Sequence, residues 1–354
     1  MLVITMIFAY CWKTCEDSIR ESNQIKEQGK WKYGMLVLSI FGTFLPMYLI
    51  NACMSYVGND YANYYTYYNN IASGRGQDVE IGYKLINIFV ARTGLGFQWV
   101  YFITCFIAYT LLIFCIRKYS QNYALSYLLF FSGGFFFLLG LNQIRQFVAV
   151  GCVFYAFQFI ENKKPLFYFA LVIIGGLFHV TAYIMLPFYF ILGKKIRLSM
   201  YTAGAVTILP INFFFNDIMT WLFKTFMPRY LNSNYISRTY ELNVPYLTMI
   251  LVTTVVVMFL VSRQKEELSV TDRVFFNACL IGMIIGVFCS WLPEYTRFVY
   301  YFLIPVISYI TKLVGYLKGR GSKLVCIASV IMADIIYVST IVGYSNVIPY
   351  KSFF

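Results

Sequence analysis

The chain has 354 residues, of which 60% are hydrophobic, 20% are aromatic and only 12% are charged. Ordinary soluble domains carry about 25% charged and about 45–50% apolar residues, so this composition excludes a soluble globular protein and a disordered one. The net charge of +13 would suggest nucleic-acid binding in a soluble protein, but basic residues in a membrane protein first of all set orientation. No nucleic-acid partner is therefore expected.

Twelve apolar runs, separated by glycine, proline and charged clusters, are predicted membrane helices. Their approximate bounds are 1–12, 34–57, 97–116, 121–140, 142–160, 165–177, 179–192, 198–222, 244–262, 273–291, 295–315 and 324–344. The two runs beside His179 are short, and they form either one long buried helix or two half-spanning ones. Twelve spans of about 20 residues use about 240 positions. The whole chain, 1–354, is thus predicted to be one all-α integral membrane domain.

Lysine and arginine predict the orientation, because cytoplasmic loops collect them. When alternate loops are compared, one side holds 19 of the 28 basic residues and the other side holds nine. The basic-rich side is predicted to be cytoplasmic, which places both termini outside. The outer side also receives the segment 58–96 and the loop 223–243, which are predicted to form part of a functional site.

No cofactor is expected from the positions of the cysteines or from the loop sequences. The nine cysteines fall mostly inside apolar runs, so neither a disulfide framework nor a metal site is indicated. Neither a G-x-G-x-x-G loop nor a Walker loop occurs. No support for cytoplasmic nucleotide-sugar chemistry is visible.

The strongest clue is the segment LGLNQIRQF, where Asn142 is predicted to cap a new helix and Arg145 falls in its first turn. A cation at a helix N-terminus opposes the helix dipole, so this arginine makes sense if an anionic ligand is shared between its side chain and free backbone N–H groups. The alternatives are that Arg145 pairs with a carboxylate such as Asp60 or Glu294, or that it extends to the membrane interface.

The same pattern recurs in SWLPEYTRFVYYF, where Pro293 suits the first helical position and Arg297 lies one turn on. Two such helix ends on the outer side predict a phosphate site.

Two outer residues are candidate bases. Asp60 lies at the external end of a span, where a carboxylate can act as a base or cap a helix. His179, the only histidine, sits in GGLFHVTAY at a predicted external turn. Its neutral imidazole could accept a proton from a sugar hydroxyl, its imidazolium could pair with phosphate, or it could simply be hydrogen-bonded at a helix junction.

Tyrosines and cations on the outer side predict glycan binding. A tyrosine combines an apolar face with a hydroxyl, which suits sugar rings and also suits membrane interfaces. The candidate glycan-binding residues are Tyr61, Tyr64, Asn142, Gln146, Glu294, Tyr300 and Tyr301. The loop 223–243 carries Arg229 and Arg238 beside further tyrosines. It is predicted to be a lid over substrate, with a solvated loop as the alternative.

Taken in order, six stretches resemble the EpsG-like family of bacterial exopolysaccharide and O-antigen (Wzy-type) polymerases. They are GNDYANYY, EIGYKLIN, NQIRQ, LFH, RFVYY and the final IPYKSFF. The resemblance runs through nearly the whole chain. It departs from the family pattern at Asn59, where threonine is common.

The resemblance implies a GT-C-like, metal-independent glycosyltransferase at the outer face of the bacterial cytoplasmic membrane. It would join oligosaccharide units carried on undecaprenyl pyrophosphate, with an acceptor hydroxyl attacking the anomeric carbon of the donor. The two helix-end arginines are then expected to hold the diphosphate, and Arg229 or Arg238 to close over it. Asp60, in preference to His179, is the expected base. The expected partners are the lipid-linked oligosaccharide and the bilayer, with a chain-length regulator as an optional third.

Three other functions remain open. A lipid-linked oligosaccharide flippase would also need cations for pyrophosphate, although they should line a cavity reachable from both faces. A ligase that transfers finished polymer is poorly separated from a polymerase by sequence. An ion-coupled transporter would use Asp217 and Asp334 as coupling sites, but this leaves the outer arginines and tyrosines unexplained.

Overall fold

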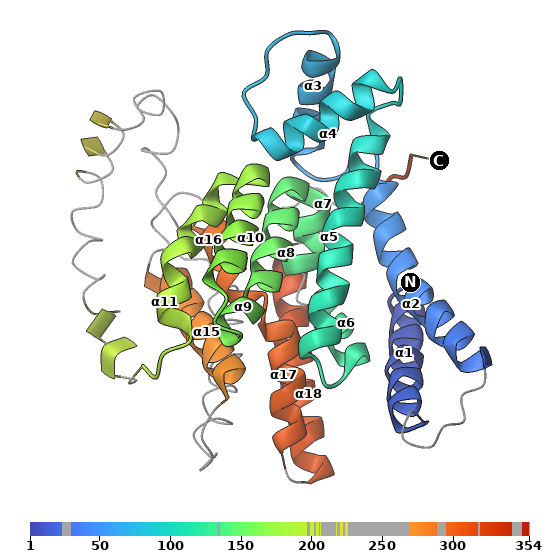
Figure 1. Ribbon diagram of the computed structural model, residues 1–354, viewed down its shortest axis with the longest axis vertical. Coiled ribbons are helices and arrows are strands. Elements are labelled where there is room, and N and C mark those ends of the chain that lie inside the picture. Colours follow the sequence, from blue (N-terminus) through green and yellow to red (C-terminus); the bar gives the residue numbers. More distant parts are fainter. Residues whose placement is uncertain are drawn as a thin grey trace.

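The computed structural model of the chain is all-helical in the part that it describes (Figure 1). It describes residues 1–22, 30–132, 135–196, 269–288, 295–317, 319–341 and 349–353, and single positions between 199 and 225. Within these residues one isolated β-bridge joins Met54 to Ser352. The prediction of an all-α protein is confirmed.

The helices follow one another closely along the chain. The first half contains α1 (Leu2–Ser22), α2 (Lys30–Ala52), α3 (Tyr61–Ala72), α4 (Ile81–Arg92), α5 (Gln98–Tyr119), α6 (Tyr123–Ser132), α7 (Phe135–Asn142), α8 (Ile144–Ala156) and α9 (Gln158–Glu161). The second half contains α10 (Pro165–Phe178), the 3-10 helix η1 (Val180–Phe188), α11 (Tyr189–Leu192), α15 (Val270–Phe288), α16 (Thr296–Leu303), α17 (Val306–Tyr316) and α18 (Arg320–Ile341).

Several helices are long and apolar enough to cross a membrane, which fits a membrane protein. Four stretches meet this condition, and the bent pair formed by α6 and α7 makes a fifth. The four are Trp31–Ala52, Gln98–Tyr119, Ile144–Glu161 and Thr296–Gly315. The predicted runs at 198–222 and 244–262 lie largely or wholly outside the described residues. The total of twelve spans and the outer placement of both termini therefore stay predictions.

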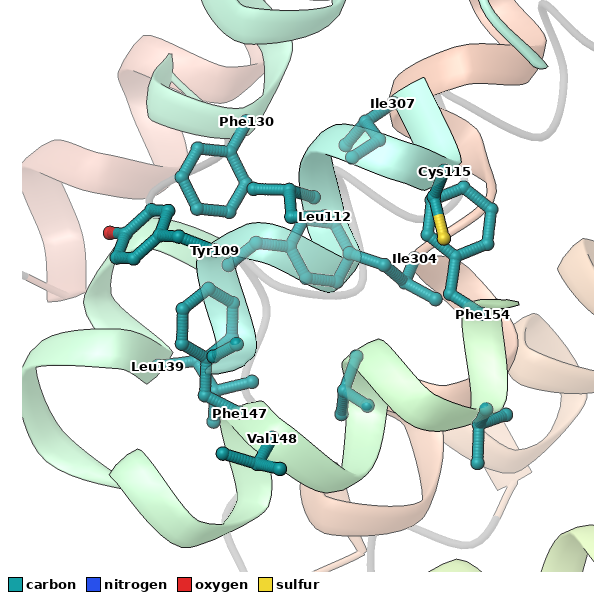
Figure 2. Close-up of a cluster of buried hydrophobic side chains, with 14 of the residues drawn as sticks. Tyr109, Leu112, Cys115, Phe130, Leu139, Phe147, Val148, Phe154, Ile304 and Ile307 are labelled. Carbon is teal, nitrogen blue, oxygen red and sulfur yellow. The ribbon is translucent and has the colours of Figure 1, made fainter. Parts of the chain in front are cut away.

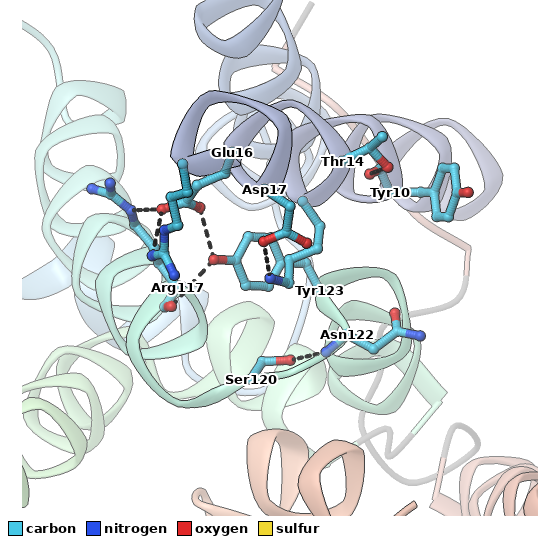
Figure 3. A network of polar contacts seen from close by, with 10 residues as sticks. Tyr10, Thr14, Glu16, Asp17, Arg117, Ser120, Asn122 and Tyr123 are labelled. Atoms are coloured by element: carbon cyan, nitrogen blue, oxygen red, sulfur yellow. Dashed lines mark hydrogen bonds and ion pairs between the residues drawn. The ribbon is translucent and has the colours of Figure 1, made fainter. Parts of the chain in front are cut away.

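Helix α1 differs most from its predicted bounds, because it continues ten residues beyond the apolar run 1–12. Its polar second half is anchored by Glu16, which is buried. The Glu16 carboxylate accepts hydrogen bonds from Arg117 Nε at 3.0 Å and from the Tyr123 hydroxyl at 2.8 Å (Figure 3). Arg20, one turn along the same helix, adds a third donor at 3.2 Å. These donors offset the desolvation of a buried carboxylate.

The core lies where α5, α6 and α8 meet the junction of α16 and α17. Figure 2 shows Tyr109 and Leu112 of α5 beside Phe130, Phe147 and Ile304. The Tyr109 and Phe147 rings meet edge to face, with centroids 5.2 Å apart, a favoured aromatic geometry. Because Phe147 lies one turn into α8, this packing fixes the start of α8 within the bundle.

Helices α3 and α4 stand beyond one end of the bundle, next to the end of α2 and the start of α5 (Figure 1). The turn between α17 and α18 lies at the opposite end (Figure 1). The chain between α2 and α3 is held from two sides. Gln98 donates hydrogen bonds to the carbonyls of Ala52 and Met54. From the other side, the backbone amides of Ser55 and Phe353 donate to the carbonyls of Lys351 and Cys53.

Candidate functional site

Arg145 lies in the first turn of α8, as predicted, but the predicted cap was wrong. Asn142 is the last residue of α7, and Gln143 holds the N-cap position of α8 without a side-chain cap bond. The two helices abut with a break of one residue, so Asn142 still belongs to the preceding helix. Its Oδ1 instead accepts a hydrogen bond from the backbone amide of Asn59 at 2.8 Å. Asn142 therefore holds the loop that leads to Asp60.

Gly58 makes this contact possible. It adopts a φ of +77°, and a Cβ built there would lie 2.6 Å from Asn142 Oδ1 and 2.7 Å from the Leu141 carbonyl oxygen. Both the left-handed backbone and the close approach favour glycine.

We expect Gly58→Ala to lower the thermal stability of the detergent-solubilised protein more than Gly74→Ala does. Gly74 has a similar φ of +72°, but nothing lies within 4 Å of a Cβ built there. The control variant therefore bears the backbone strain of about 1–2 kcal/mol without the clash. Thermal unfolding of both variants tests this, and equal losses would show that the contact with Asn142 contributes nothing.

The guanidinium of Arg145 is surrounded by side chains from α3 and α4. It forms an ion pair with Glu80, and it lies over the rings of Tyr64, Tyr67 and Tyr83 at 5.4–5.7 Å from their centroids. Its Nε is buried and has no hydrogen-bond partner in the described part of the chain. The site thus contains a buried donor that a ligand could use.

Among the described residues the carboxylate partner of Arg145 is Glu80 and not Asp60, whereas Glu294 lies outside them. A carboxylate pair was one of the sequence-based alternatives, but Glu80 was not singled out. Its signal was present, because Glu80 opens the stretch EIGYKLIN and directly precedes a helix, in the N-cap position of α4.

Arg297 lies in the first turn of α16 and comes close to the start of α8. The side chain of Gln146, next to Arg145 in sequence, donates a hydrogen bond to the backbone carbonyl of Arg297 at 2.7 Å. Both arginines interact electrostatically with Tyr64 and with His179. The two helix-end arginines therefore converge on one place.

His179 lies at the same place, in the non-helical junction between α10 and η1. It is buried, and its Nδ1 lies 2.6 Å from the Thr181 hydroxyl. That hydroxyl lies 2.9 Å from the hydroxyl of Tyr301 on α16. Burial and then the charges of Arg297 and Arg145 lower the pKa of His179 from 6.5 to about 3, so the imidazole is neutral at physiological pH.

We expect the single histidine to remain neutral in pH titrations down to about pH 4, with NMR of its ring as the measurement. Arg297→Ala should raise the His179 pKa, because a like charge is removed. Inorganic pyrophosphate should also raise it, because an anion offsets both arginines. As pH falls, the histidine of the unfolded chain becomes protonated near pH 6.5, whereas that of the folded chain becomes protonated only near pH 3. Within this window proton binding favours the unfolded state, so the fold loses stability as pH falls. Titration near pH 6.5 in the folded protein would contradict the described burial.

Asp60 holds the N-cap position of α3, yet its side chain makes no cap hydrogen bond. It interacts electrostatically with Tyr64, whose ring contacts Arg145. The capping alternative for Asp60 is thus not supported, and the carboxylate lies beside the cluster.

Sequence comparison supplies the family. The model of the EpsG family matches residues 37–352, nearly the whole chain. The chain belongs to the EpsG family. No curated protein and no solved structure gives a significant match.

The conspicuous stretches of this EpsG-family chain meet in space at one cluster. They contribute Asp60, Glu80, Arg145, His179 and Arg297, in chain order. The final stretch belongs to the same end of the molecule, since its backbone pairs with residues 53–55 before α3. Motifs that look scattered in sequence therefore lie together in one cluster of this chain.

The tyrosines predicted to bind glycan differ in exposure. Tyr61 and Tyr64 are buried, and Tyr61 stacks on Tyr101 with centroids 5.4 Å apart. Tyr301 is also buried, whereas Tyr300 is partly exposed. Burial gives the first three a packing role, and their contact with glycan stays a prediction.

Three predicted site residues of the EpsG-family chain lie outside the described residues, namely Arg229, Arg238 and Glu294. Among the residues that are described, no group of three or more His, Cys, Asp and Glu side chains could hold a metal ion.

Proposed function

We propose that this EpsG-family protein is a polysaccharide polymerase that joins lipid-linked repeat units at the outer face of the bacterial cytoplasmic membrane. The observation that carries the proposal is the convergence of Arg145 and Arg297, each in the first turn of a helix, on a neutral histidine at one end of an apolar helical bundle. Helix N-termini and guanidinium groups both attract phosphate oxygens.

The proposed reaction is glycosyl transfer from undecaprenyl pyrophosphate. The acceptor hydroxyl oxygen at the non-reducing end of a lipid-linked unit forms a bond to the anomeric carbon of the donor glycan. The bond from that carbon to the pyrophosphate oxygen breaks, and its electron pair leaves with the pyrophosphate. The hydroxyl proton passes to Asp60, and the two arginines stabilise the charge that develops on the leaving group.

The surroundings of the cluster suit such a substrate. Tyr300, one turn after Arg297, offers a partly exposed ring for sugars. The proposed reaction needs no metal ion, because the arginines supply the positive charge.

Incubating the purified protein with its lipid-linked repeat unit in detergent tests the proposal. We expect a ladder of products on a gel, unchanged by EDTA and absent when Arg145→Ala is used. Unchanged substrate would overturn the polymerase proposal, and movement of that substrate across vesicle membranes by the same preparation would assign a flippase instead. Loss of the ladder with EDTA would overturn metal independence alone.

A further inference from the structure

Two hydroxyl groups in a row connect His179 to helix α16. They belong to Thr181 and to Tyr301, which is fully buried. The Tyr301 and Thr181 hydroxyls lie 2.9 Å apart, and the Thr181 hydroxyl lies 2.6 Å from His179 Nδ1.

The direction of the row begins at Tyr301. Among the described residues, the Thr181 hydroxyl is the hydrogen-bond partner of the Tyr301 hydroxyl. A buried donor left without an acceptor costs free energy, so Tyr301 donates its proton to the Thr181 oxygen.

Each hydroxyl in the row has one proton to donate. The proton of Tyr301 points to Thr181, its partner in the row. The Thr181 oxygen accepts that proton, so its own proton points to His179 Nδ1. A neutral imidazole that accepts at Nδ1 carries its proton on Nε2.

We propose that Tyr301 and Thr181 are positioning residues that fix His179 as the Nε2–H tautomer, so that it donates a hydrogen bond to the substrate diphosphate and does not act as the base. The tautomer follows from the hydrogen-bond row, whereas its role rests on the proposed function. Of the two candidate bases, Asp60 then takes the proton.

This tautomer is suited to an anionic ligand. An imidazole that accepts at Nδ1 presents an N–H donor at its far edge, and both guanidinium groups act electrostatically on this histidine. Its neutrality avoids a third positive charge beside Arg145 and Arg297. The neutral donor thus contributes a hydrogen bond to a phosphate oxygen without adding to the repulsion between cations in the empty site.

The first test is long-range ¹H–¹⁵N NMR of the wild-type protein in detergent, with ring-labelled histidine and a purification tag that has no histidine. The chain contains one histidine, so each ring nitrogen gives one assignable signal. We expect Nδ1 at the unprotonated position and Nε2 at the protonated one. The reverse assignment, or two protonated nitrogens at neutral pH, overturns the proposal.

Variants of the row show whether it sets the tautomer. Thr181→Val removes the hydroxyl and should produce a mixture of both tautomers, whereas Thr181→Ser should restore the wild-type spectrum. Thr104→Val is the matched control, because its buried hydroxyl bonds to the Val100 carbonyl at 2.6 Å on α5. An unchanged tautomer in Thr181→Val would show that the row does not determine it.

Elongation assays test the role of His179 separately. Glutamine presents an amide N–H near the position of Nε2, so His179→Gln should keep about ten times more activity than His179→Ala, as expected for one hydrogen bond to a charged group. Equal losses in both variants would overturn the donor role. A ladder with the reversed tautomer would contradict only this inference, and the expected tautomer without any ladder would contradict only the polymerase proposal.

Discussion

Replacing Arg145 by alanine is expected to abolish chain elongation, with single repeat units accumulating on the lipid carrier. Removal of a charged donor aimed at a developing anion costs about 100-fold to 1,000-fold in rate, and Arg297→Ala should have an effect of the same size. The measurement is the product ladder from purified variants that insert normally into membranes. Normal long polymer from either variant would count strongly against the site.

Two control variants distinguish the loss of a positive charge that acts on the substrate from damage to the fold. Arg75→Ala removes an exposed arginine between α3 and α4 that bonds only to Ser73 among the described residues, and it should leave elongation unchanged. Arg145→Ala also leaves Glu80 without its ion-pair partner. The double variant Arg145→Ala/Glu80→Gln should remain inactive if the guanidinium acts on substrate, whereas recovery would assign the loss to the unpaired carboxylate.

Asp60→Asn is expected to reduce elongation by about 100-fold to 10,000-fold, because the acceptor hydroxyl loses its base. Asparagine is of similar size and is an equally good N-cap residue, so the variant should fold and insert normally. Elongation rate and thermal unfolding of the same preparation check both expectations.

Asp78→Asn is the matched control, because Asp78 is an exposed carboxylate between α3 and α4. Full activity of Asp60→Asn would exclude it as the base. A large loss of stability would instead assign Asp60 a structural role.

Local sequence patterns predicted helices such as α5 and α8 and the first-turn position of Arg145, because both depend on neighbouring residues. Helices α3 and α4 were missed, since no apolar run was predicted within the segment 58–96. The sequence also predicted that the two arginine-bearing helix ends lie on the same side of the membrane, and therefore at a similar depth. This is compatible with their convergence. The length of α1 was missed, because its polar half is held by a buried Glu16 that pairs with Arg117, 101 residues away.

Partners that depend on tertiary packing could not be read from the sequence. The Glu80–Arg145 pair joins residues 65 apart, and the Thr181–Tyr301 contact joins residues 120 apart. A threonine two residues after the histidine carries no signal by itself. It acquires a role only because η1 and α16 bring the two hydroxyls together.

The ion pair between Arg145 and Glu80 also bears on which lipids the site discriminates against. A phospholipid headgroup with a single negative charge gains little from a guanidinium whose charge is already balanced by a carboxylate. A diphosphate carries more charge and can reach Arg297 at the same time, so it gains from both cations. The Glu80 carboxylate would thus keep ordinary membrane lipids from occupying the site, at the cost of weaker binding for every anion.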